Sequence, residues 1–174
     1  WNINILNGPY FLKWTHDLSS NILGVGLKSH PNDPWMLNNR AYVNARINKL
    51  DEAEKDMEQL EHCNKALSES MSICKEATHG LIDYCRKDRE KGRKLYEQAI
   101  LRASTMKENS EEIKVKAQIN MLREEIIFSN YQNTSALMEL EQLVIPNEKL
   151  ELVKLRNEVF DEMKKNEKNQ GWRF

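Results

Sequence analysis

The sequence contains little proline or glycine, with four and six of these residues among 174. Folds built from many short strands need both residues at their turns, so this shortage disfavours them and leaves long helices possible. The sequence also lacks an apolar run close to the roughly 20 residues that cross a bilayer. We therefore predict an all-α domain without a membrane partner.

An excess of one charge is missing as well. Lys and Arg number 26 against 27 Asp and Glu, which gives a formal net charge of −1, and the two signs alternate along the chain. Nucleic acids attract proteins through surplus Lys and Arg, and no basic stripe with stacking aromatics is present. This balance predicts no nucleic-acid partner and disfavours RNA binding by a helical repeat.

Signals for export and for catalysis are absent. The sequence starts at Trp1 without a basic-then-apolar leader, and we expect it to be part of a longer cytoplasmic protein. It has no Gly-rich phosphate loop or nucleophile elbow, and the neighbouring Glu124 and Glu125 point to different faces of a helix. We predict that the chain is not an enzyme and needs no cofactor.

Cysteine is scarce, and the three thiols do not form a metal motif. Zinc-binding side chains occur, but no Cys-x-x-Cys or His-x-x-x-His pair places two of them on one helical turn. We predict no metal site and interpret the cysteines as reduced, small core residues. The residues concerned are His62, Cys63, Cys74, His79 and Cys85.

Three segments have the pattern of paired amphipathic helices, over residues 34–60, 70–106 and 109–144. Asp33 is a good N-cap before Pro34, and the partner helix is expected to begin at Leu50 after a turn. Asp88 is the expected cap within the second segment. In the third segment Asn109 and Glu112 have capping-box spacing, and a turn is expected over 130–133.

The second helix of each pair carries a small residue followed by apolar residues four and seven positions later. Such a stripe forms one helix face, and its small residue lets a neighbouring helix approach closely. An earlier segment fits the same pattern and gives a fourth, N-terminal copy. The four sets are Ser19/Leu23/Gly26, Ala53/Met57/Leu60, Gly92/Tyr96/Ala99 and Ala136/Leu140/Leu143.

The segment HPNDPWMLNNRAYVNARINKLDEAEKDMEQL resembles a tetratricopeptide repeat, with Ala41 and Ala53 at the two small packing sites and Pro31 at the closing proline. HGLIDYCRKDREKGRKLYEQAI is similar. The match weakens over 117–143, where Glu124 replaces a small residue.

This resemblance implies a right-handed α-solenoid of about three to four antiparallel helix pairs over residues 14–146. Residues 1–13 are then a linker or a truncated first unit. Residues 147–174 supply a C-terminal helix and tail. That helix caps the end of the stack or, alternatively, packs on another domain.

The first helices of such an array line a concave face, which implies binding of a peptide or helix from a partner protein. The alternative is a regulatory domain that selects targets for a larger enzyme. The family's carboxylate clamp for chaperone tails is not reproduced, because Cys74 and Thr78 occupy positions that need Lys and Arg. The predicted partner-binding residues are Trp35, Asn38, Asn39, Tyr42, Arg46, Thr78 and Tyr84, and the same face is expected to include Ala77, Leu81, Met121, Leu122, Glu125 and Phe128.

Polar residues also occur where the family has apolar ones. Arg40 is followed by Asn44 and His79 by Asp83, in each case one turn later, and Arg123 has the corresponding position in the third pair. Buried polar groups must be satisfied, so we expect a ladder of polar contacts between helices. The alternatives are a ligand-sensing charge network, or His79 acting as a base that Asp83 orients.

Overall fold

The computed structural model describes the backbone of residues 9–63, 66–146 and 149–169, and the side chains of this part from Thr15 to Lys164. These residues form helices without a strand among them, so the predicted all-α class is confirmed. None of the described helices is both long and apolar enough for a bilayer span. The helices are α1 Pro9–Ser29, α2 Pro34–Arg46, α3 Leu50–Glu61, α4 Glu69–Cys85, α5 Arg89–Thr105, α6 Ser110–Phe128, α7 Thr134–Gln142 and α8 Leu150–Asn169.

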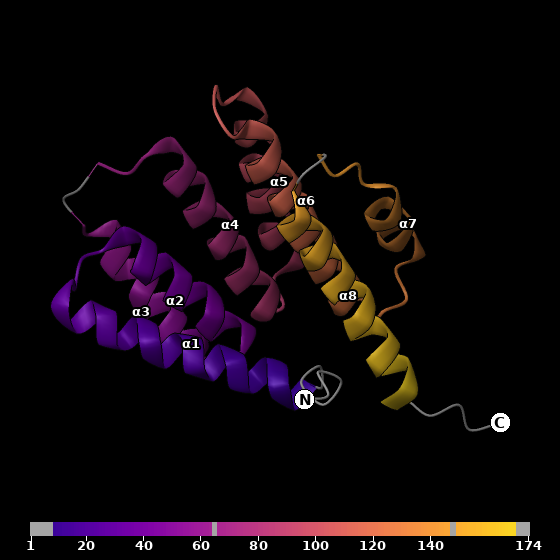
Figure 1. Cartoon of the computed structure of the whole chain (residues 1–174), viewed down its shortest axis with the longest axis horizontal. Coiled ribbons are helices and arrows are strands. Elements are labelled where there is room, and N and C mark those ends of the chain that lie inside the picture. The colour runs from indigo at the N-terminus through magenta and orange to yellow at the C-terminus, as the bar shows by residue number, and fades with distance from the viewer. Residues whose placement is uncertain (1–8, 64–65, 147–148, 170–174) are drawn as a thin grey trace.

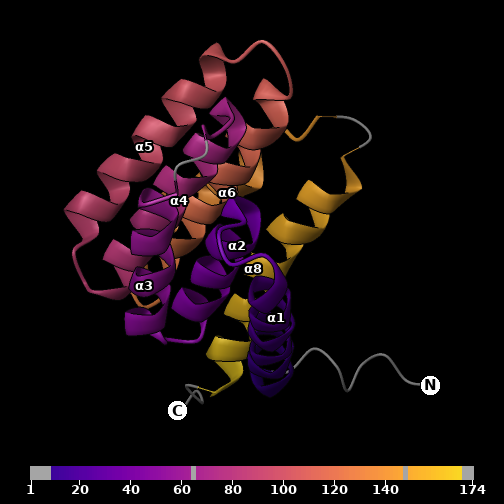
Figure 2. The same ribbon diagram turned by 90° about the vertical axis from the view of Figure 1, so that its left-hand side faces the viewer.

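The helices are arranged as successive pairs, α2 with α3, α4 with α5 and α6 with α7. Figure 1 shows them following one another from α1–α3 at one end of the molecule to α6–α8 at the other. The first helix of each pair packs against the first helix of the next, and α8 packs against α6. Figure 2 shows α3 and α5 along one side, α1 and α8 on the opposite side, and α2, α4 and α6 between them.

Most helix starts follow the expected capping chemistry. Oδ1 of Asp33 accepts a hydrogen bond from the Met36 amide at 2.9 Å, and Asp88 caps α5 in the same way. The predicted capping box at Asn109 is not formed. Asn109 has a left-handed φ of 54° and makes no side-chain cap bond, because an N-cap side chain reaches the first-turn amides from an extended backbone.

The N-terminal helix begins earlier than the sequence suggested. α1 starts at Pro9, so residues 9–13 belong to a helix and not to a linker, while residues 1–8 lie outside the described part. Proline is well tolerated in the first turn, where its missing N–H would have no helical partner. Pro9 therefore marks a helix start.

The small-residue stripe of the three later pairs is buried in the core, as predicted, whereas the N-terminal copy of Ser19, Leu23 and Gly26 is only half-buried. Ala53, Gly92 and Ala136 are all buried, as are the residues four positions later. A Cβ added at Gly92 would lie 2.8 Å from the carbonyl oxygen of Gly80, so α4 and α5 approach each other almost backbone to backbone. The last member of the stripe, Leu143, is only half-buried because α7 ends before it.

The predicted polar contacts between helices are present as separate bridges. Arg40 of α2 donates to Asp56 of α3 at 2.8 and 2.5 Å, and Asn44 accepts from Ser20 of α1 at 2.7 Å. On α4, Nε2 of His79 lies 3.3 Å from Glu61, and Asp83 accepts from Lys91 of α5 at 2.9 Å. Each polar residue thus links its helix to a different neighbour.

Candidate functional site: an inner cavity

A cavity of about 960 Å³ lies along α2, α4 and α6, and we call it the inner cavity. The C-terminal helix α8 forms its opposite wall, and one residue of α1 also reaches it. The lining residues are His16, Trp35, Asn38, Asn39, Tyr42, Arg46, Ile47, Asn48, Ser70, Ile73, Cys74, Ala77, Thr78, Tyr96, Glu112, Ile113, Lys116, Ala117, Asn120, Arg123, Tyr131, Leu155, Glu158, Val159 and Glu162.

The structure brings almost all predicted partner-binding residues together in this cavity. The predicted residues that line it are Trp35, Asn38, Asn39, Tyr42, Arg46 and Thr78.

Tyr84 is the exception, because it is buried and does not line the cavity. Its hydroxyl donates to Glu125 at 2.5 Å, and its ring contacts Tyr96 and Phe128. The ring fills the space left by the missing side chain of Gly92, whose added Cβ would lie only 2.6 Å from it. Tyr84 therefore belongs to the packing between helices.

The prediction of which face of α6 lines the cavity is wrong, because the helix is rotated about its axis relative to the expected orientation. Met121, Leu122 and Glu125 are buried against neighbouring helices, Phe128 lies outside the cavity, and on α4 Leu81 is buried while Ala77 lines the cavity as expected. The residues that α6 presents instead are Glu112, Ile113, Lys116, Ala117, Asn120 and Arg123.

The rotation follows from the position of α6, which packs against α4, α5, α7 and α8. Residues 113, 116, 117 and 120 have the spacing of one helix face, so they were a possible signal for this surface.

The buried part of the lining, which we call the floor, is largely apolar. Ile73, Thr78 and Ala117 are buried there, while Trp35 remains 47% exposed at the rim. Asn38 is 5% exposed, and its Oδ1 has no hydrogen-bond partner within the described part of the chain. This Oδ1 is itself buried, so the exposed amide of Asn39 is the polar group that the lining offers beside the apolar floor.

A chain of charged side chains crosses the cavity. Oε1 of Glu124 accepts hydrogen bonds from Arg46 of α2 and Arg123 of α6, both at 3.0 Å. Arg123 also donates to the Tyr42 hydroxyl at 2.9 Å, and Arg46 reaches Glu162 of α8 at 3.4 Å. These contacts connect α2, α6 and α8 directly, and they account for a carboxylate at the position where the first pairs have a small residue.

A second buried carboxylate, Glu125, fastens α6 to the other side of the array. It accepts from Tyr84 of α4 and from Arg89 of α5, the latter at 3.0 and 2.7 Å. Burial acts to raise the pKa of Glu125, but the hydrogen bonds from Arg89 and Tyr84 and the nearby positive charges outweigh it and hold the pKa below its ordinary value.

This depressed pKa predicts acid sensitivity. A carboxyl group that is more acidic in the folded than in the unfolded state stabilises the fold above its unfolded pKa of about 4.5, and this contribution is lost as the pH falls through the folded value. We expect Glu125→Gln to be less stable at pH 7 and to lose less stability than the parent below about pH 4.5. Urea denaturation over a pH series measures both.

Glu111 provides the matched control, because it is exposed and pairs with Lys114 on the same helix surface, away from Glu125 and its partners. Glu111→Gln should keep the acid dependence of the parent protein. Equal pH slopes for Glu125→Gln and the parent would contradict the assigned role of Glu125.

The cavity and its surroundings do not resemble a metal centre. In the described ranges, no three His, Cys, Asp or Glu side chains come close enough together to hold an ion. Comparison of the chain with family models, with curated proteins and with solved structures found no match. The fold and the site therefore define the class directly: an all-helical protein with successive helix pairs around an inner cavity.

Proposed function

We propose that the chain is a repeat array of the tetratricopeptide type that holds a segment of a partner protein in the inner cavity. The burial of the small residues on which the repeat resemblance rests supports this assignment. Ala41, Ala53 and Ala99 are each 0% exposed. The observation that carries the proposal is the inner cavity, which combines a buried apolar floor with a polar rim on the first helices of the pairs.

The chemistry of the lining suits a peptide. The amides of Asn39 and Asn120 lie in the lining and can donate and accept hydrogen bonds, as a peptide backbone requires. The floor around Ile73 offers a site for an apolar side chain, and Trp35 is the kind of residue that often dominates interface energies.

The charges of the lining balance, which favours a partner segment of low net charge. Arg46, Lys116 and Arg123 are opposed by Glu112, Glu158 and Glu162. Like-charge contacts would penalise a strongly acidic or basic segment. We therefore propose that a mixed apolar and polar segment occupies the cavity.

The test selects peptides from a random library on the purified chain and measures their affinity by fluorescence anisotropy. Asn39 is exposed and lines the cavity, so Asn39→Trp fills the cavity without disturbing the core. We expect this variant to weaken the selected peptides by at least about tenfold, the loss typical of a blocked central contact.

The control places the same side chain on the outer surface. Leu101 of α5 is 68% exposed and lies outside the cavity, so Leu101→Trp should bind the selected peptides with parental affinity. Circular dichroism of both variants verifies the fold. Equal affinities for Asn39→Trp and Leu101→Trp would move the binding surface away from the inner cavity and defeat the proposal.

A further inference from the structure

We propose that α8 is a movable wall of the inner cavity and that the ion pair between Arg46 and Glu162 holds this wall closed. This inference rests on the proposed function, because it assigns a control of access to the same cavity. Its evidence comes from how α8 is attached to the rest of the chain. The test needs no partner protein.

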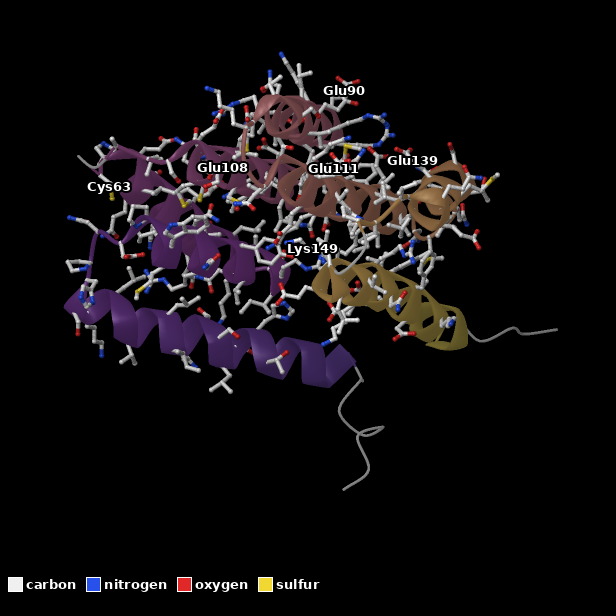
Figure 3. All side chains as sticks on the ribbon, turned by 45° about the horizontal axis from the view of Figure 1, so that its top comes forward. Cys63, Glu90, Glu108, Glu111, Glu139 and Lys149 are labelled. Atoms are coloured by element: carbon white, nitrogen blue, oxygen red, sulfur yellow. The ribbon has the colours of Figure 1, made fainter. Side chains whose placement is uncertain are left out.

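The side of α8 that faces α6 and α7 is firmly packed. Leu152 and Val159 are 4% and 2% exposed and belong to the apolar cluster of these helices. Lys149 lies at the start of α8 (Figure 3). It pairs with Glu112 near the start of α6 at 2.5 Å. This side provides an axis about which α8 can tilt while remaining attached.

The side of α8 that faces α2 is attached differently. The cavity separates the two helices, and α8 contributes Glu158 and Glu162 to its lining. Leu155 and Val159 also reach the cavity, but they pack against the cluster of α6 and α7. Arg46 and Glu162 form an ion pair across this gap, at 3.4 Å. Lys149 lies beside Glu112 at one end, and Glu162 reaches Arg46 beside Glu124 at the other, so α8 runs parallel to α6 along the cavity.

Arg46 makes opening inexpensive because it is shared between two carboxylates. Its Nη1 binds Glu124 at 3.0 Å, which is shorter than the 3.4 Å contact of Nη2 with Glu162. When α8 moves away, Arg46 keeps Glu124 and is not left as an unpaired buried charge, the situation that makes broken buried ion pairs costly. Glu162 has a 26% exposed side chain and can be hydrated.

The thiol of Cys74 reports on the position of α8. Cys74 lies in the cavity lining and is half-buried, so a bulky maleimide reaches it faster when α8 tilts outward. With Cys63 and Cys85 replaced by serine, its labelling rate is measured by mass spectrometry. We expect Glu162→Gln to increase this rate about two- to fivefold, the range for a partly exposed ion pair.

Glu158→Gln is the matched control. Glu158 lies one turn before Glu162 on the same cavity-lining face, and the described residues give it no ion pair, so its removal should leave the rate unchanged. High salt weakens partly exposed ion pairs, so 1 M NaCl should accelerate labelling of the parent more than labelling of Glu162→Gln. An unchanged rate in Glu162→Gln would overturn the proposal.

General loosening of the fold is tested with Cys85 as the remaining thiol, after Cys63 and Cys74 are replaced. Cys85 lies outside the cavity lining, and burial together with the nearby Glu124 raises its pKa to about 11. An equal acceleration at Cys85 in Glu162→Gln would also overturn the movable wall. If Asn39→Trp leaves the peptide affinities unchanged, only the proposed function is contradicted. The movable wall is tested separately, since Cys74 labelling does not depend on a bound peptide.

Discussion

Replacing Glu124 with alanine should lower the free energy of unfolding by about 3–5 kcal/mol, the usual loss when one partner of a buried ion pair is removed. Glu124 accepts hydrogen bonds from Arg46 and Arg123, and the side chain of Arg123 is only 6% exposed. In the variant Arg123 keeps the Tyr42 hydroxyl, but its buried charge loses the adjacent carboxylate. Urea denaturation at pH 7 measures the difference.

An exposed pair provides the comparison. Glu97→Ala removes the i,i+4 contact with Arg93, and its effect should stay within about 0.5 kcal/mol. In the double variant Arg123→Met/Glu124→Met both charges are removed, and it should be more stable than Glu124→Ala, because no buried charge is left unpaired. A loss below about 1 kcal/mol for Glu124→Ala would mean that water solvates this cluster and that it does not act as a buried network.

A second large effect is expected where α4 and α5 touch. Gly92→Ala should cost about 1–3 kcal/mol, the usual penalty of forcing a methyl group into a packed interface. The added Cβ would lie 2.8 Å from the backbone oxygen of Gly80 and 2.6 Å from the Tyr84 ring. The backbone oxygen can move only if α4 moves with it. Thermal and urea unfolding both report the loss.

The sign of the stability change in Gly92→Ala is informative. Alanine is ordinarily the better helix former by about 1 kcal/mol, so a loss of stability must come from the contact between α4 and α5. Gly24 in α1 is the matched control, since an added Cβ there would lie 3.4 Å from Nη1 of Arg40, an ordinary van der Waals contact. Gly24→Ala should therefore stabilise the protein by up to about 1 kcal/mol. A stabilising Gly92→Ala would show that α4 and α5 can separate without cost.

Local chemistry explains why the helix pairs could be predicted from the sequence. Asp33 and Asp88 cap helices with their own neighbouring amides, and Gly92 marks a close approach by its lack of a side chain. These signals act over a few residues, so they are readable before the fold is known. The face presented by α2 followed from the same helical period.

The parts that could not be predicted depend on distant neighbours. The rotation of α6 is fixed by packing against α4, α5, α7 and α8 together. Two different faces of this helix had a suitable sequence pattern. Tyr84 has the spacing of a cavity-lining residue, yet its hydroxyl donates a hydrogen bond to the carboxylate of Glu125, 41 positions later in the chain. Glu124 departed from the repeat pattern, and only the structure supplies its two arginine partners.

The contacts from α2 to α6 affect how the array unfolds. In an ideal linear array each unit touches only its neighbours, so the units can melt one after another from an end. Here Arg46 binds Glu124 over a sequence separation of 78 residues, bypassing the pair in between. Losing the last pair would leave the first with an unmatched charge, and both ends of the chain should melt in a single cooperative transition.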